Sequence, residues 1–124
     1  MLRYLLGALA ACLIVLAAGA EEKINRFDVG IEVRQNGDIL VTETINVAVE
    51  GRDIRRGIFR DLPRYYADDL KPGDKLPYQY DVRRVRRDGR KEPYTIEHDG
   101  NAYRIRIGDA DVLLDYGAHT YVIE

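Results

Sequence analysis

The sequence predicts an all-β protein, an antiparallel β-sandwich-like domain preceded by a signal peptide helix. Apolar and polar residues alternate through most of the chain after residue 20, which is typical of half-buried strands. Turn sequences that contain Gly separate the alternating runs. The first 20 residues are almost wholly apolar. We therefore expect six to eight strands, and no helix longer than two turns after Ala20.

Residues 1–20 have the pattern of an export signal. Its positive start, apolar core and small-residue cleavage site are Arg3, Leu5–Leu16 and Ala18–Ala20. We expect cleavage after Ala20, which leaves residues 21–124 as one extracytoplasmic domain. An uncleaved anchor is an alternative, because about 17 apolar residues lie near the length that spans a bilayer. Lipidation of Cys12 is a weaker one, because the residues after it stay apolar.

The composition limits the function classes. The only Cys lies in the expected signal, so the mature domain forms no disulfide and depends on its core. The signal holds one of the 19 basic residues and none of the 21 acidic ones, so the remainder has a formal charge of −3. Nucleic-acid binding is not expected of such an acidic chain. No pattern for a cofactor is present, and we expect none.

The first two strands are expected over residues 24–34 and 39–49. In the first strand, Phe27, Val29, Ile31 and Val33 share one face, which we predict to be half-buried. Asn36-Gly37 between the strands predicts a type I′ hairpin turn.

Glu43 lies in phase with the buried residues of the second strand. A carboxylate on a buried face needs a partner, a proton or a bulge that displaces it. We expect Arg60 to pair with it, because apolar neighbours direct Arg60 toward the core. A structural ion pair is favoured over a catalytic carboxylate.

The stretch Gly57–Pro63 is predicted to be a short, specifically shaped connection between strands. Ile58, Phe59 and Leu62 are expected to anchor it in the core. Arg60 and Asp61, with Phe59, are candidate binding residues, since loops often carry function.

Residues 64–77 are predicted to be a long surface loop, rich in charges and helix or strand breakers. A third strand is expected from Tyr78 to Arg87, ending at a turn at Asp88-Gly89. The basic residues near its end are candidates for binding phospholipid headgroups or an acidic polymer: Arg84, Arg86 and Arg87. The alternative is an edge strand that uses basic residues to prevent edge-to-edge pairing.

Three further segments complete the pattern. Strands are expected around Tyr94–Glu97 and Tyr103–Ile107, with a tight turn between them, and a last strand begins at His119. The acidic residues between the last two strands lack the full spacing of a Ca²⁺ loop, so no metal site is expected: Asp109, Asp111 and Asp115. His98 and His119 stand alone, with no spacing that indicates a metal or a catalytic set.

Several of these stretches together resemble the extracytoplasmic N-terminal domain of the YciQ-like family, predicted bacterial membrane proteins of unknown function. They are Ile24–Asp28, Asn36-Gly37, Val41–Ile45, Gly57–Pro63, Tyr103–Gly108 and Tyr121–Ile123. The resemblance implies a β-rich outer domain followed by membrane-spanning helices, so we expect the present chain to be truncated at its C-terminus. It implies no catalytic residues.

Two functional classes are open. The first is a non-enzymatic interaction or scaffold domain that contacts an envelope protein, an envelope polymer or the membrane surface. The second is a carboxylate-dependent hydrolase or carbohydrate-processing domain, which needs two carboxylates facing each other across a cleft. The first is favoured, because the strand-borne carboxylates mostly alternate outward.

Overall fold

The computed structural model describes residues 21–124, so the expected export signal lies outside the described residues. This part of the chain forms ten strands and no helix. The strands are Lys23–Val33 (β1), Ile39–Val49 (β2), Gly57–Pro63 (β3), Tyr65–Ala67 (β4), Lys75–Pro77 (β5), Val85–Arg87 (β6), Arg90–Lys91 (β7), Tyr94–Asp99 (β8), Ala102–Gly108 (β9) and Gly117–Ile123 (β10). The predicted all-β fold is confirmed. The strand count exceeds six to eight because short strands form in segments that we expected to be loops.

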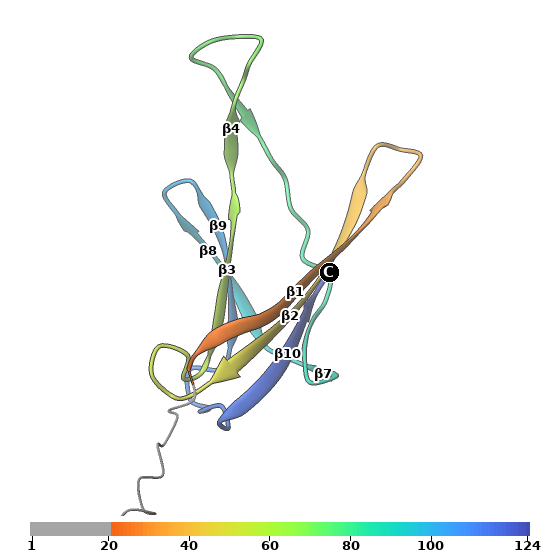
Figure 1. The fold of residues 1–124 in the computed structure, drawn as a ribbon. Coiled ribbons are helices and arrows are strands. Elements are labelled where there is room, and N and C mark those ends of the chain that lie inside the picture. Colours follow the sequence, from red (N-terminus) through yellow and green to blue (C-terminus); the bar gives the residue numbers. More distant parts are fainter. Residues whose placement is uncertain (1–20) are drawn as a thin grey trace, which may run out of the picture.

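The strands form three antiparallel sheets. The larger sheet has the order β1-β2-β10-β6-β7, the smaller one β3-β9-β8, and β4 pairs with β5 alone. Figure 1 shows the larger sheet running diagonally across the upright strands of the smaller one, with the β4–β5 hairpin extending away from both. β1 is an edge strand of the larger sheet and β3 is an edge strand of the smaller one, so each pairs with a single strand.

One core lies between the two main sheets. Its fully buried residues come from both: Ile45, Val47, Val49, Val85, Tyr121 and Ile123 from the larger sheet, and Ile105 and Ile107 from the smaller, with Leu114 from a loop. Each such side chain contributes about 1.5–3 kcal/mol by leaving water. These residues alternate with less buried ones along β2, β9 and β10, as the period-two pattern predicts.

The first hairpin is present, but its turn is not type I′. Such a turn needs positive φ at both central residues. Gly37 has φ 91°, whereas Asn36 is not among the residues with positive φ. Instead the Gly37 N–H donates to the Arg34 carbonyl and the Arg34 N–H to the Asp38 carbonyl. This is a three-residue loop with Gly in the left-handed position, a common hairpin alternative.

The prediction of a half-buried face on β1 is wrong. Phe27, Val29, Ile31 and Val33 share one face, but they are between 44% and 74% exposed. The buried core residues of the larger sheet come from β2, β6 and β10, so the smaller sheet packs over these strands and leaves β1 uncovered. Figure 1 shows the far end of the β1–β2 hairpin extending beyond the smaller sheet.

Gly57–Pro63 is also different from the prediction, because it is strand β3 rather than a connection. It pairs along its whole length with β9. Gly57 is required for close approach: a Cβ there would lie 1.7 Å from the Ile107 carbonyl oxygen. Pro63, which lacks a donor, is tolerated because β3 is an edge strand. Phe59 is 54% exposed and does not anchor the strand in the core, whereas Ile58 and Leu62 pack against the core.

Residues 64–77 contain the β4–β5 hairpin instead of a structureless loop. The expected strand from Tyr78 is regular only from Val85 onward. Its turn does form as expected, with positive φ at both Asp88 (51°) and Gly89 (79°).

The start of the described chain is held by one side chain. The Glu22 carboxylate accepts four backbone N–H bonds from the loop after β2. The donors and distances are Glu50 at 3.2 Å, Arg52 at 2.7 Å, Asp53 at 2.8 Å and Ile54 at 3.2 Å. Against the effect of burial, these bonds lower the pKa of Glu22 below its usual value. The loop is thus shaped by a residue that precedes β1.

Candidate functional site

Arg60 and Glu43 form a two-pronged ion pair between the sheets. Arg60 Nε donates to Glu43 Oε2 at 2.7 Å, and Nη2 donates to Oε1 at 2.6 Å. Glu43 is 7% exposed, and Arg60 Nη1 also donates to the Asp61 carbonyl at 2.7 Å. The hydrogen bonds to Glu43 raise the pKa of Arg60. The pair therefore connects β2 to β3 with both charges satisfied.

A groove of about 580 Å³ lies beside this pair, where β1 and β3 face each other. Its lining comes from three sources: Ile24 and Phe27 on β1, Ile45 and Val47 on β2, and Asp53, Ile54 and residues 57–61 in and before β3. The Arg60 guanidinium lies 5.6 Å from the centre of the Phe27 ring and spans the groove. The side chains are mostly apolar, and the two strands at its rims are edge strands.

The outer face of the smaller sheet carries a ladder of charges. Arg104 binds the Asp61 carboxylate with two hydrogen bonds of 2.8 Å. Arg106 binds Glu97 in the same manner at 2.8 and 3.1 Å, and both guanidiniums lie over the Phe59 ring. The hydrogen bonds from Arg104 lower the pKa of Asp61. Phe59 and Asp61 are thus engaged within the sheet rather than free.

The three basic residues that the sequence offered as binding candidates near β6 do not form a common patch of unpaired charge. Arg87 is half-buried and bonds to the Glu92 carboxylate, with Asp88 3.6 Å away. Arg84 lies 3.7 Å from the Glu124 carboxylate. Arg86 is exposed, and within residues 21–124 it has no ion pair. Arg84 and Arg87 are therefore engaged within the domain, and of the three candidates Arg86 alone keeps an unpaired charge among the described residues.

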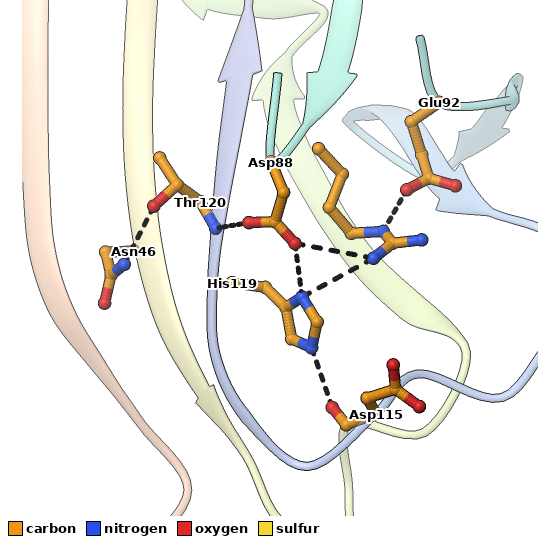
Figure 2. A network of polar contacts seen from close by, with 7 residues as sticks. Asn46, Asp88, Glu92, Asp115, His119 and Thr120 are labelled. Carbon is orange, nitrogen blue, oxygen red and sulfur yellow. Dashed lines mark hydrogen bonds and ion pairs between the residues drawn. The ribbon is translucent and has the colours of Figure 1, made fainter. Parts of the chain in front are cut away.

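Figure 2 shows a polar network around His119 that spacing in the sequence could not indicate. His119 Nδ1 lies 2.6 Å from Asp88 Oδ2, and Nε2 lies 2.7 Å from the Asp115 carbonyl oxygen. The other Asp88 oxygen accepts the Thr120 N–H at 2.8 Å. His119 and Asp88 are 31 residues apart, so only the pairing of β10 with β6 brings them together.

The partners of His119 determine its charge. A carbonyl oxygen cannot donate, so Nε2 carries a proton, and an ionised Asp88 also requires a donor at Nδ1. Arg87 is 3.5 Å from Nδ1, too far to compete with Asp88. Burial alone lowers the pKa of His119, but the bonds to Asp115 and Asp88 outweigh it and raise the pKa. His119 therefore bridges the turn that contains Asp88 and the loop that contains Asp115, and these two contacts favour its protonated form.

Tyr121 lies next to this network and is completely buried. Its hydroxyl has no hydrogen-bond partner in the described chain. Burial raises the pKa of Tyr121 to about 12. An unpartnered buried hydroxyl costs stability without giving an interaction in return.

A second hollow, of about 380 Å³, lies at the base of the β4–β5 hairpin. Its lining is aromatic and polar without a carboxylate: Arg64, Tyr65, Pro77, Tyr78, Gln79, Tyr80, His98 and Tyr103. The clustering of Tyr before and after residues 67–77 was the available sequence signal, which the interpretation of this stretch as a loop obscured.

The acidic residues between β9 and β10 do not converge. Asp109 instead closes a turn by accepting the Asp111 N–H at 2.8 Å. Within residues 21–124, no group of three His, Cys, Asp or Glu residues is placed to hold a metal ion. The same residues include no helix that is long and apolar enough to cross a membrane.

These features define an all-β domain with antiparallel sheets, two surface hollows and several ion pairs between strands. Comparison with known proteins then identifies the family. The chain belongs to the family described as "Predicted membrane protein (DUF2207) N-terminal domain", whose model matches residues 23–124. The resemblance to YciQ-like proteins is thereby confirmed, and membership supports association with a membrane.

A curated relative is the "Uncharacterized protein YciQ" of Escherichia coli strain K12. It is 32% identical over 104 residues, which cover 83% of this chain and 16% of the relative. The chain therefore spans about a sixth of the length of this relative. No solved structure matches the chain.

Proposed function

We propose that this domain is a non-enzymatic interaction module of a membrane protein, and that it binds an extended segment of a partner protein along the groove between β1 and β3. The observation that carries the proposal is the pair of edge strands at the rims of an apolar groove. An edge strand presents unpaired N–H and C=O groups, to which an added strand can bond.

The exposed face of β1 supports this choice of partner. Phe27, Val29, Ile31 and Val33 form a continuous apolar row along a single strand. Scattered apolar residues are normal on protein surfaces, but a contiguous row marks a contact site. An added segment with alternating side chains would cover this row and continue into the groove.

The carboxylates beside the groove support the alternative function, a carboxylate-dependent hydrolase, less than they support a binding role. A glycosidase acid needs a raised pKa, and its partner carboxylate needs to be free. Asp61 has a lowered pKa and two hydrogen bonds to Arg104, and Glu43 is bound by Arg60. A binding role therefore fits the charges better than acid catalysis.

Site-specific photo-crosslinking in the full-length protein tests the proposal. A crosslinking amino acid at Phe27, in the groove, should capture one polypeptide, whereas the same group at exposed Thr95 on β8 should not. Ile31→Lys should abolish capture. Glu32→Lys is the matched control, because it places the same side chain on the opposite face of β1.

The purified partner segment should then slow hydrogen exchange of the β1 backbone amides. The proposal is wrong if Phe27 crosslinks only to lipid or glycan, or if the β1 amides exchange at an unchanged rate with saturating partner.

A further inference from the structure

The hollow at the base of the β4–β5 hairpin is a built site, independent of the groove between β1 and β3. Its wall is fixed by reciprocal hydrogen bonds: Asn101 Oδ1 accepts the Tyr65 N–H at 3.0 Å, and Asn101 Nδ2 donates to the Tyr65 carbonyl at 3.1 Å. Tyr80 donates its hydroxyl to the Pro63 carbonyl at 2.6 Å. The β8–β9 turn thus holds the hairpin base in place.

Aromatic rings dominate the hollow. The Tyr80 and Tyr103 rings contact each other at 5.1 Å between centres, and His98 contacts Tyr103 at 5.7 Å. Tyr65 and Tyr78 remain 40% and 49% exposed, so part of each ring is available to a ligand. Tyrosine provides an apolar ring together with a hydroxyl for hydrogen bonding, a combination enriched at binding sites.

Arg64 distinguishes this site from the rest of the domain. Four arginines in the described chain are half-buried: Arg60, Arg64, Arg87 and Arg104. Three of them bind carboxylates, those of Glu43, Glu92 and Asp61. Arg64 has no ion pair within residues 21–124; its guanidinium lies 5.4 Å from the Tyr65 ring centre and donates only to the Gly100 carbonyl, at 3.2 Å.

The lining contains no carboxylate to balance this charge. A guanidinium that is partly removed from water and lacks a counter-ion favours an anionic ligand, and its fork of donors matches a carboxylate. The volume of about 380 Å³ lies within the range of small-ligand sites. The site therefore suits a ring with one apolar face, several hydroxyls and one acidic group.

We propose that this hollow binds an acidic sugar residue, a pyranose ring that carries a carboxylate, within a glycan chain. The carboxylate is held by Arg64, the apolar face of the ring stacks on Tyr65 and Tyr78, and the hydroxyls bond to Gln79 and His98. A proline-rich segment also fits aromatic grooves, but it offers no charge for Arg64.

Titration of the full 124-residue chain in a neutral detergent tests the proposal. The chain has no Trp, and four of its nine Tyr line this hollow, so ligand binding here should change the tyrosine fluorescence. Trigalacturonate should produce a saturable change in fluorescence. Neither maltotriose, which is a neutral sugar, nor free acetate should produce this change. Arg64→Gln should weaken binding by about tenfold or more, and Arg64→Lys by less, because a charge-assisted hydrogen bond is lost or partly kept.

Arg34→Gln is the matched control, because it removes an exposed arginine at the distant β1–β2 turn. Unchanged thermal unfolding of the Arg64 variants ensures that lost binding is not lost folding. Equal binding of maltotriose, an equal affinity of Arg64→Gln, or a stronger response to a polyproline peptide would overturn the proposal. Failure here leaves the β1–β3 groove untouched, since the two sites share no residue.

Discussion

Removal of either partner of the Glu43–Arg60 pair should destabilise the domain far more than removal of an exposed pair. Breaking a buried ion pair from one side costs about 3–5 kcal/mol, because the remaining charge is left without a partner. The Arg60 side chain keeps 28% of its surface in solvent. We therefore discount this scale for solvent screening and expect about 2–3 kcal/mol for Glu43→Ala or Arg60→Ala, and a fall in Tm of roughly 10–20 °C for a domain of this size.

The double variant separates pairing from independent effects. If the two charges depend on each other, the double substitution should cost at least about 1 kcal/mol less than the sum of the single ones. Thermal unfolding followed by circular dichroism gives the stability of the four proteins in this double-mutant cycle: the unsubstituted domain, the two single variants and the double variant.

A matched control comes from the next residue of β3. Asp61 and Arg104 form the same two-pronged contact, but the Asp61 side chain is 43% exposed. Its removal should cost no more than about 1 kcal/mol. Small, additive effects at Glu43 and Arg60 would refute the view that this pair stabilises the contact between the sheets.

Three more predictions concern single residues. Tyr121→Phe should leave stability unchanged or raise it by up to about 1–3 kcal/mol, because it removes an unpartnered buried hydroxyl; a clear fall in Tm would mean that the hydroxyl is bonded. The pKa of His119 is raised on folding, so its stabilisation is full below about pH 6.5 and is lost as pH rises through the folded pKa; a pH series of Tm should show this loss, and His119→Gln should flatten it. Gly57→Ala should destabilise the domain by more than about 2 kcal/mol, since the new Cβ meets a backbone carbonyl at 1.7 Å, whereas Gly30→Ala, with its nearest atom at 3.9 Å, should not; equal Tm values for these two variants would contradict the close approach of β3 and β9.

Local patterns in the sequence predicted the parts of the fold that depend on neighbouring residues. Alternation located β1, β2, β8, β9 and β10, and parity along β2 placed Glu43 on the buried face. The face of β1 was wrongly expected to be half-buried, because alternation reports which residues share a face but not whether a second sheet covers that face. Phe59 was misassigned for a related reason, since its ring lies under arginines of β9 rather than in the core.

The polar sites were harder to predict, because they depend on strand pairing. His119 appeared isolated in the sequence, and its contact with Asp88 exists only because β10 lies beside β6. Arg87 was a binding candidate in the sequence, yet the β6–β7 hairpin brings Glu92 to it. The tyrosine hollow likewise required the β8–β9 turn to meet the base of the β4–β5 hairpin.

The position of Glu22 sets a limit on how the protein can be matured. Its carboxylate holds the loop whose residues Asp53 and Ile54 form part of the groove wall. A protease that cut after residue 22 would leave four backbone donors without their acceptor and release this wall. Cleavage after Ala20, by contrast, keeps Glu22 as the second residue of the new N-terminus. If the predicted leader is removed, the groove wall stays intact only when the cut falls before Glu22.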